Sequence, residues 1–193
     1  MIFELLHVPF PDEYGEGLLP LEQCKRHLRI TSDDEDELIQ VLRDAAIEFV
    51  EQYCGVRLAP MTGLQWQAQR FPVAASVPLP LSVAPVTAIT SVSWLDTDGG
   101  EVTGSPDDYR VTSRGDVLPA ISSRWPSAVG GMVKIEFEAG YPSGSAPKSL
   151  LMAAKMFLGH LWMHREAVID SGSMGEVPFG VRQLCAPFSR VLI

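Results

Sequence analysis

Five consecutive acidic residues, Asp33 to Glu37, are the densest group of potential metal ligands in the sequence. A calcium-binding loop of the EF-hand type needs carboxylates at alternating positions, a glycine at the sixth position and a glutamate at the twelfth. In this chain the carboxylates are consecutive, Leu38 stands at the sixth position and Asp44 at the twelfth. The pattern therefore does not indicate a calcium site.

The same acidic run is typical of the start of a helix. Ser32 and Glu35 have the spacing of a capping box, in which each side chain accepts a hydrogen bond from a free backbone N–H of the first turn. Acidic residues in that turn also interact favourably with the helix dipole, by roughly 0.3–1 kcal/mol each. We therefore predict that Ser32 caps a helix and that the acidic run has no catalytic role.

Two histidines, His160 and His164, are four residues apart and would share one face of a helix, a spacing that zinc sites use. The metalloprotease motif has a glutamate directly after the first histidine, whereas this chain has Leu161. A nearby carboxylate, Glu166 or Asp170, could supply a third ligand for a metal-dependent hydrolase. The alternative is that one histidine packs inside the protein and the other binds carbonyl groups at the helix end.

No other motif indicates catalysis or a cofactor, because the sequence has no G-x-S-x-G elbow, no P-loop and no G-x-G-x-x-G fingerprint. Its three cysteines, Cys24, Cys54 and Cys185, contain no C-x-x-C pair, and we expect them to be small buried side chains. The net charge of −9 argues against binding nucleic acid through its phosphates. The sequence also has neither a long apolar run nor a basic start, so we expect no membrane span and no secretory signal.

The first third of the chain reads as helical after an N-terminal arm or loop that extends to Leu19. Apolar residues at helical spacing predict a short helix over residues 21–28 and a long helix that begins in the acidic run after Ser32 and that Gly55 is placed to end. Ile47 points away from the main apolar stripe of the long helix, so we expect neighbours to touch this helix from more than one side. The stripe comprises Leu38, Leu42, Ala45, Ala46, Phe49 and Tyr53.

Alternating apolar residues and turn residues from Gly63 to Phe137 predict five or six short antiparallel strands. Pro147 then begins a long helix that is apolar nearly all round, and Pro178 begins a last short helix. The order predicts an α+β fold: the N- and C-terminal helices form a small helical bundle with an inserted antiparallel β-module. We expect one folding unit, divided into an arm and first helical part, the β-module, and a second helical part with a C-terminal tail, at residues 1–62, 63–140 and 141–193.

Residues 21–58, "LEQCKRHLRITSDDEDELIQVLRDAAIEFVEQYCGVRL", resemble the N-terminal signature of the phage head–tail connector, or adaptor, proteins. That signature has a short helix ending K-x-H-L-R-I/V, an acidic turn, and an amphipathic helix ending near a tyrosine and G-R. The chain departs from it at Cys54, where the family often has threonine, and at Val56, which separates the glycine from the arginine. Three later segments are similar to the longer form of the family, which carries a β-module: residues 91–111, 133–168 and 177–191.

This resemblance, which covers about residues 20–190, implies a structural protein with no catalysis and no cofactor. Members of the family form a homo-oligomeric ring beneath the portal of a tailed phage or of a phage-like particle such as a gene transfer agent. DNA passes through the ring, the C-terminal segment engages the portal protein, and the opposite side receives the next connector or tail protein. The implied location is the neck of the virion, reached after assembly in the host cytoplasm.

Candidate contact residues follow from this resemblance and from their positions in the chain. The apolar C-terminal tail suits docking on a portal, for which the candidates are Phe188, Arg190, Val191, Leu192 and Ile193. The long helix and the loop after the penultimate helix suit contacts between subunits, for which the candidates are Arg43, Ile47, Glu51, Arg165 and Glu166. Two other functions stay open: the metal-dependent hydrolase, and a β-module that binds a peptide or glycan.

Overall fold

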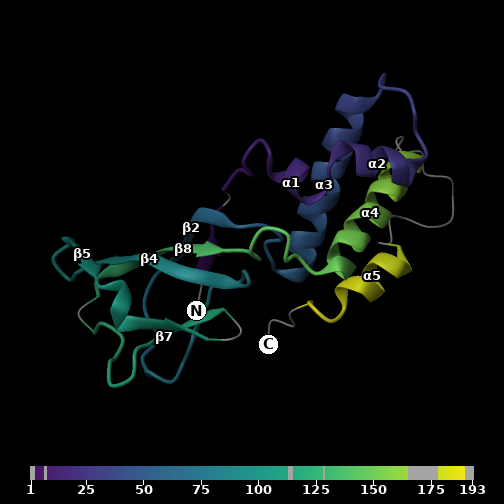
Figure 1. Ribbon diagram of the computed structural model, residues 1–193. Helices are drawn as coiled ribbons and strands as arrows, with labels where there is room; N and C mark the ends of the chain where they lie inside the picture. Colours follow the sequence, from purple (N-terminus) through teal and green to yellow (C-terminus); the bar gives the residue numbers. More distant parts are fainter. Residues whose placement is uncertain (1–2, 7, 113–114, 128, 165–177, 190–193) are drawn as a thin grey trace, which may run out of the picture. The chain divides into compact units, whose positions relative to one another are not determined.

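The computed structural model describes residues 3–6, 8–112, 115–127, 129–164 and 178–189. The chain divides into two compact units, one made of Met1–Pro9 and Pro60–Tyr141 and the other of Phe10–Ala59 and Pro142–Ile193. The first unit, named the β unit below, contains the strands, and the second, the helical unit, contains the α-helices (Figure 1). Helices from both ends of the chain therefore pack together in one unit, and the strands between them in the sequence form the other, so the predicted α+β fold is confirmed.

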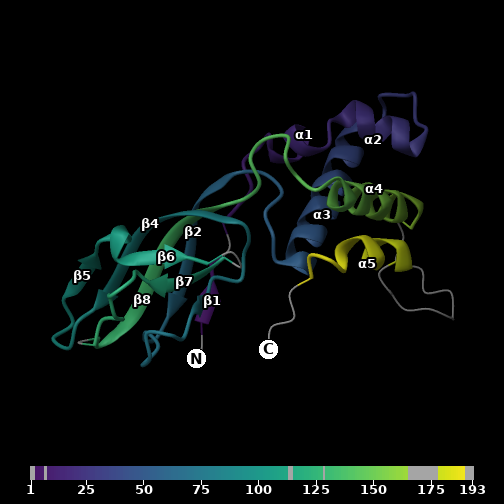
Figure 2. The ribbon, with the colours of Figure 1, turned by 60° about the horizontal axis from the view of Figure 1, so that its bottom comes forward.

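The helical unit contains, within the described residues, α1 (Tyr14–Leu18), α2 (Leu21–Leu28), α3 (Asp36–Cys54), α4 (Lys148–Met163) and α5 (Phe179–Cys185). α3 contacts α1, α2, α4 and α5, which confirms that neighbours touch it from more than one side (Figure 2). α3 ends at Gly55, whose φ of +64° is a left-handed conformation that glycine adopts at little cost. Within the described residues, none of these helices is both long enough and apolar enough to cross a membrane.

The start of α3 differs from the predicted capping box. The helix begins at Asp36, and Glu35 rather than Ser32 occupies the N-cap position. The Ser32 hydroxyl accepts a hydrogen bond from the Asp34 N–H at 3.3 Å and donates one to the Asp34 carboxylate. Ser32 therefore stabilises a turn before the helix, because its side chain finds a partner two residues away and never reaches the first turn of α3.

The inward face of α3 also differs from the predicted stripe. Of the six residues in that stripe, Ala46 alone is buried, whereas Leu38, Ala45 and Tyr53 are exposed. The difference arises because Arg43 and Glu51 belong to the inward face. A prediction that counts apolar positions alone assigns these two charged residues to the solvent-facing side. The buried residues of α3 are Ile39, Arg43, Ala46, Ile47, Val50, Glu51 and Cys54.

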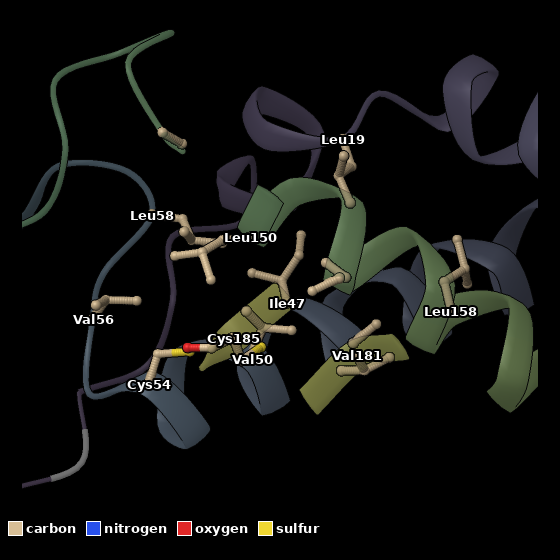
Figure 3. Close-up of a cluster of buried hydrophobic side chains, with 14 of the residues drawn as sticks. Leu19, Ile47, Val50, Cys54, Val56, Leu58, Leu150, Leu158, Val181 and Cys185 are labelled. Carbon is tan, nitrogen blue, oxygen red and sulfur yellow. The ribbon is translucent and has the colours of Figure 1, made fainter. Parts of the chain in front are cut away.

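The core of the helical unit gathers apolar side chains from α3, α4, α5 and the connecting segments (Figure 3). The three cysteines are buried free thiols, as predicted, and the Cys54 thiol donates to the Cys185 carbonyl oxygen at 3.9 Å. The sequence of α4 is apolar nearly all round, which predicts a fully buried helix. The helix is only partly buried, because Met152, Met156 and Met163 are exposed. One side of α4 therefore belongs to the surface of the helical unit.

The β unit holds two antiparallel sheets, with strand orders β1-β2-β8-β4-β5 and β3-β7-β6. Alternation is clear in β8, where Val133, Ile135 and Phe137 are buried and Lys134 and Glu136 are exposed. The strands are β1 (Phe3–Leu5), β2 (Met61–Ala68), β3 (Leu79–Pro80), β4 (Val86–Leu95), β5 (Glu101–Gly104), β6 (Tyr109–Val111), β7 (Asp116–Pro119) and β8 (Gly131–Ala139).

The N-terminal segment is more ordered than the arm or loop that the sequence predicts. Phe3–Leu5 forms a strand that pairs with β2, with Phe3 opposite Ala68, while Tyr14–Leu18 forms α1. Strands of two or three residues carry too few side chains to show alternation, so β1 and β3 were not recognisable from sequence. That the two units fold as one cooperative whole stays a prediction.

Replacing Gly55 by alanine tests the end of α3. We expect Gly55→Ala to lower the free energy of unfolding by about 1 kcal/mol, because a Cβ disfavours the left-handed conformation. Gly17→Ala is the matched control, since Gly17 lies in α1 with nothing within 4 Å of its Cβ position. Denaturant unfolding should show Gly17→Ala unchanged or slightly more stable, and an unchanged Gly55→Ala would contradict the assignment.

Candidate interaction surfaces

Three residues of α3 that the sequence proposes as subunit contacts lie inside the helical unit. Arg43 is 3 % exposed, Ile47 1 % and Glu51 0 %. Ile47 projects into the apolar core beside Leu150 (Figure 3). The fold therefore does not place these side chains where a neighbouring subunit could touch them, because each is engaged within its own chain.

Glu51 is the centre of a buried hydrogen-bond network. Its carboxylate accepts from the Tyr14 hydroxyl at 2.5 Å and from the Leu58 N–H at 2.6 Å, with Arg57 Nη1 at 3.4 Å. The Tyr14 oxygen in turn accepts from the Ala59 N–H at 3.1 Å. Burial raises the pKa of Glu51, against the lowering effect of the Leu58 N–H. The network ties α1 to the segment that leaves α3.

Arg43 has a comparable set of partners on the same face of α3. Its guanidinium pairs with Asp44 at 2.8 Å and with Glu16 of α1. Gly15 allows α1 to come this close, because a Cβ on Gly15 would lie 1.8 Å from Asp44 Oδ1. Both buried charges of α3 are therefore satisfied partly by α1.

The acidic run pairs with a lysine that the sequence did not single out. The Lys25 side chain is 6 % exposed, and its Nζ lies 2.5 Å from Asp33 and 2.8 Å from Asp36. The two carboxylates raise the pKa of Lys25, and the lysine lowers the pKa of Asp33. The run thus joins α2 to the start of α3. No motif signalled the pairing, which spans eight and eleven residues and includes a turn.

The half-buried His160 ring stacks on an aromatic neighbour, and the exposed His164 ring lies tilted beside it. The His160 and His164 ring centroids are 4.7 Å apart, and His160 stacks on Phe157 at 6.0 Å. Burial lowers the pKa of His160, and the charge of His164 adds to the effect. Within the described residues no three His, Cys, Asp or Glu side chains gather closely enough to hold a metal ion. The proposed third ligands, Glu166 and Asp170, lie outside those residues.

Of the remaining candidate contact residues, in the tail and in the loop after α4, the structure describes Phe188 and leaves the others outside the described residues. Phe188 packs half-buried against the helical core, and its N–H donates to the Cys185 carbonyl oxygen at 2.9 Å. Phe188 therefore anchors the end of α5 on its own chain. The candidates outside the described residues are Arg165, Glu166, Arg190, Val191, Leu192 and Ile193.

A polar hollow of about 270 Å³ lies on the outward face of the larger sheet in the β unit. Glu101, Lys134 and Glu136 line it together with glutamine and serine side chains. Small-molecule sites are mostly apolar cavities of roughly 300–1,000 Å³ with a few directed polar groups. This hollow has a different character, so it gives no support to a ligand-binding β-module.

Comparisons with known proteins come from one family and from solved structures. Residues 19–98 match the family described as "Phage gp6-like head-tail connector protein". Two similar structures are chains of "Neck of empty GTA particle computed with C6 symmetry", at 21% identity, and "Virion of native gene transfer agent (GTA) particle", at 23%. Each match has a TM-score of 0.70 and covers 100% of this chain and 97% of the other.

A third match covers 98% of this chain and 97% of a chain of "Neck of native GTA particle computed with C12 symmetry", with 21% identity and a TM-score of 0.70. No curated protein matches the chain. At these identities the structural matches establish a shared fold over the whole length. The family match independently confirms the resemblance to head–tail connectors over residues 19–98.

Substitutions of Glu51 test the buried network. We expect Glu51→Ala to lower the free energy of unfolding by about 3 kcal/mol, because it leaves the Leu58 N–H buried without an acceptor and leaves the Tyr14 hydroxyl with only the long contact to the Ala59 carbonyl oxygen, at 3.4 Å. Glu51→Gln keeps one acceptor oxygen and should cost less. Glu48→Ala, which removes a half-exposed carboxylate of the same helix, is the control and should cost under about 0.5 kcal/mol. Equal losses for Glu48→Ala and Glu51→Ala would contradict the network.

The lowered pKa of His160 predicts a pH dependence of stability. The folded protein takes up this proton less readily than the unfolded chain, so stability falls as the pH drops below the ordinary histidine pKa of about 6.5. We expect His160→Gln to lose less stability than the unsubstituted protein between about pH 7.5 and about pH 5.5. Urea unfolding at both pH values measures the difference, and identical losses would show that His160 does not contribute.

Proposed function

We propose that this chain, whose residues 19–98 match the phage gp6-like head-tail connector family, is a structural connector in the neck of a tailed phage or gene transfer agent. One observation carries the proposal. The fold of the whole chain, helices and β unit together, matches chains of gene transfer agent particles over 97% of their length. A shared fold alone does not assign a function, but here it agrees with an independent family match.

A homo-oligomeric ring beneath the portal is the assembly that this function requires. Two of the similar structures come from necks computed with C6 and C12 symmetry. A ring of six or twelve subunits needs a heterologous interface, in which one surface of each subunit binds a different surface of the next. We propose such a ring for this chain, with the portal on one side and a further connector or tail protein on the other.

DNA would pass through this ring without specific binding. Proteins that hold DNA do so largely through lysine and arginine contacts to phosphates. The net charge of −9 supports a conduit that repels the phosphates. The function proposed is structural and involves no reaction and no membrane.

Portal docking is proposed for the last residues of the chain. Phe188 packs on its own helical unit, so we assign docking to the four residues Arg190, Val191, Leu192 and Ile193. Val191, Leu192 and Ile193 are apolar, and their side chains would be buried against the portal. Arg190 would add a charged hydrogen bond to a carboxylate there.

Binding to a portal ring tests the proposed function. The mass of the complex is measured by size-exclusion chromatography with light scattering, for the full chain and for a chain that ends at Ser189. We expect the full chain to bind the portal ring of its own particle and the shortened chain to bind about tenfold or more weakly.

The control for this experiment is Val73→Ser, which changes a fully exposed apolar residue of the β unit and should bind like the full chain. Failure of the full chain to bind any portal ring would overturn the proposed function. Equal binding by the shortened chain would overturn the docking role of the last four residues alone.

A further inference from the structure

α3 carries an apolar stripe that is partly open to solvent along most of its length. Leu42 and Phe49 within it are half-buried, and the Phe49 ring also stacks on Phe157 of α4. This α3 stripe includes Val41, which is 60 % exposed, and the stacked rings of Phe49 and Tyr53, whose centroids are 5.8 Å apart. From the first to the last residue it extends about 22 Å along the helix. Its members are Leu38, Val41, Leu42, Ala45, Phe49 and Tyr53.

α4 and α5 together present a second apolar surface. Met163 is 75 % exposed and Phe179 71 %. Gly180 allows α5 to pack beside the same methionines, because a Cβ on it would lie 2.5 Å from Met156 Cε. Methionine side chains are flexible and fill irregular contacts well. The methionine patch comprises Met152, Met156, Met163 and Phe179.

The two surfaces are bordered by opposite charges. α3 has one basic residue, Arg43, which is buried and paired, and its other charged residues are all acidic. Exposed Glu37 and Asp44 stand near the α3 stripe. α4 and α5 contain no acidic residue, and their lysine and arginine residues are Lys148, Lys155 and Arg182. Contact between the stripe and the patch would therefore bring opposite charges together.

This arrangement is what a ring subunit needs. A stripe-to-stripe contact would place acidic residues against acidic residues, and a patch-to-patch contact would place basic residues against basic ones. A stripe-to-patch contact avoids both, and it uses two different surfaces of one compact unit. Apolar surfaces of this kind on a subunit mark interaction sites.

We infer that the α3 stripe of one subunit docks on the methionine patch of the next copy of this chain. The inference rests on the proposed ring function and names the surfaces that close the ring. It replaces Arg43, Ile47 and Glu51, which the fold keeps inside, with residues on the opposite side of the same helix.

Two charge-introducing variants test the contact. Val41→Lys alters the stripe and leaves the methionine patch intact, whereas Met152→Glu alters the patch and leaves the stripe intact. Both positions are exposed, so circular dichroism and the unfolding midpoint should match the unsubstituted protein. Ile121→Lys, at an apolar residue of the β unit that is 89 % exposed, is the control. Sedimentation velocity measures the assembly of each protein, alone and with the portal ring.

We expect the unsubstituted chain and Ile121→Lys to form ring-sized assemblies, and each interface variant alone to associate about tenfold or more weakly. An equimolar mixture of Val41→Lys and Met152→Glu retains one intact stripe and one intact patch. The mixture should therefore associate where neither variant does alone, through the intact pair of surfaces and through the altered pair, whose introduced charges are opposite. Association in the mixture distinguishes a heterologous contact from general loss of solubility.

Other outcomes separate the inference from the function on which it rests. Ring assembly by both variants would overturn the inference and leave the connector function standing. Normal assembly of Met152→Glu together with loss in Val41→Lys would show that the stripe binds another surface, and would overturn the pairing. If Val41→Lys assembled normally but lost portal binding, the stripe would face the portal instead. No assembly by the unsubstituted chain, with or without the portal ring, would overturn both proposals.

Discussion

Two buried charges on α3 constrain the whole helical unit. Removing a charged side chain from water costs several kcal/mol unless other groups replace the solvent. Arg43 finds its partners in Glu16 and Asp44, and Glu51 finds one in Tyr14. Glu16 and Tyr14 both belong to α1, so this five-residue helix determines which face of α3 turns inward. A rotation of α3 about its axis would break both sets of contacts at once.

The orientation of α3 explains why apolar residues are left at the surface. With the charged positions held inside, Leu38, Val41 and Tyr53 cannot also reach the core. A monomer would be more stable with these apolar residues buried and the charged residues exposed, since burying apolar area is the main source of stability. An assembling subunit instead keeps that area for its partner. The two buried charges and the exposed apolar residues of α3 thus both follow from one orientation of the helix.

Periodicity predicted the helices, the strand region and their order, because these depend on local patterns that repeat over many residues. The rotation of α3 was missed, since a buried arginine looks like a surface residue until Gly15 and Glu16 are brought beside it. The sequence correctly predicted that the acidic run lies at the start of a helix. It did not predict the ion pair between Asp33 and Lys25, because that pair depends on the turn between α2 and α3. The choice of Arg43, Ile47 and Glu51 as subunit contacts had the same cause as the missed rotation of α3, because they were chosen by charge and by an apparent opposite face.

The positions of the three thiols give the helical unit a reporter of its own opening. Cys24, Cys54 and Cys185 lie in α2, α3 and α5, all are buried, and the β unit has none. A thiol reagent can therefore react only when a part of the helical unit opens, and its rate measures that opening. Burial also raises the pKa of Cys24 to about 11, so the reactive thiolate is scarce until the site is exposed. Labelling kinetics would thus follow the loosening or tightening of one unit without any added probe.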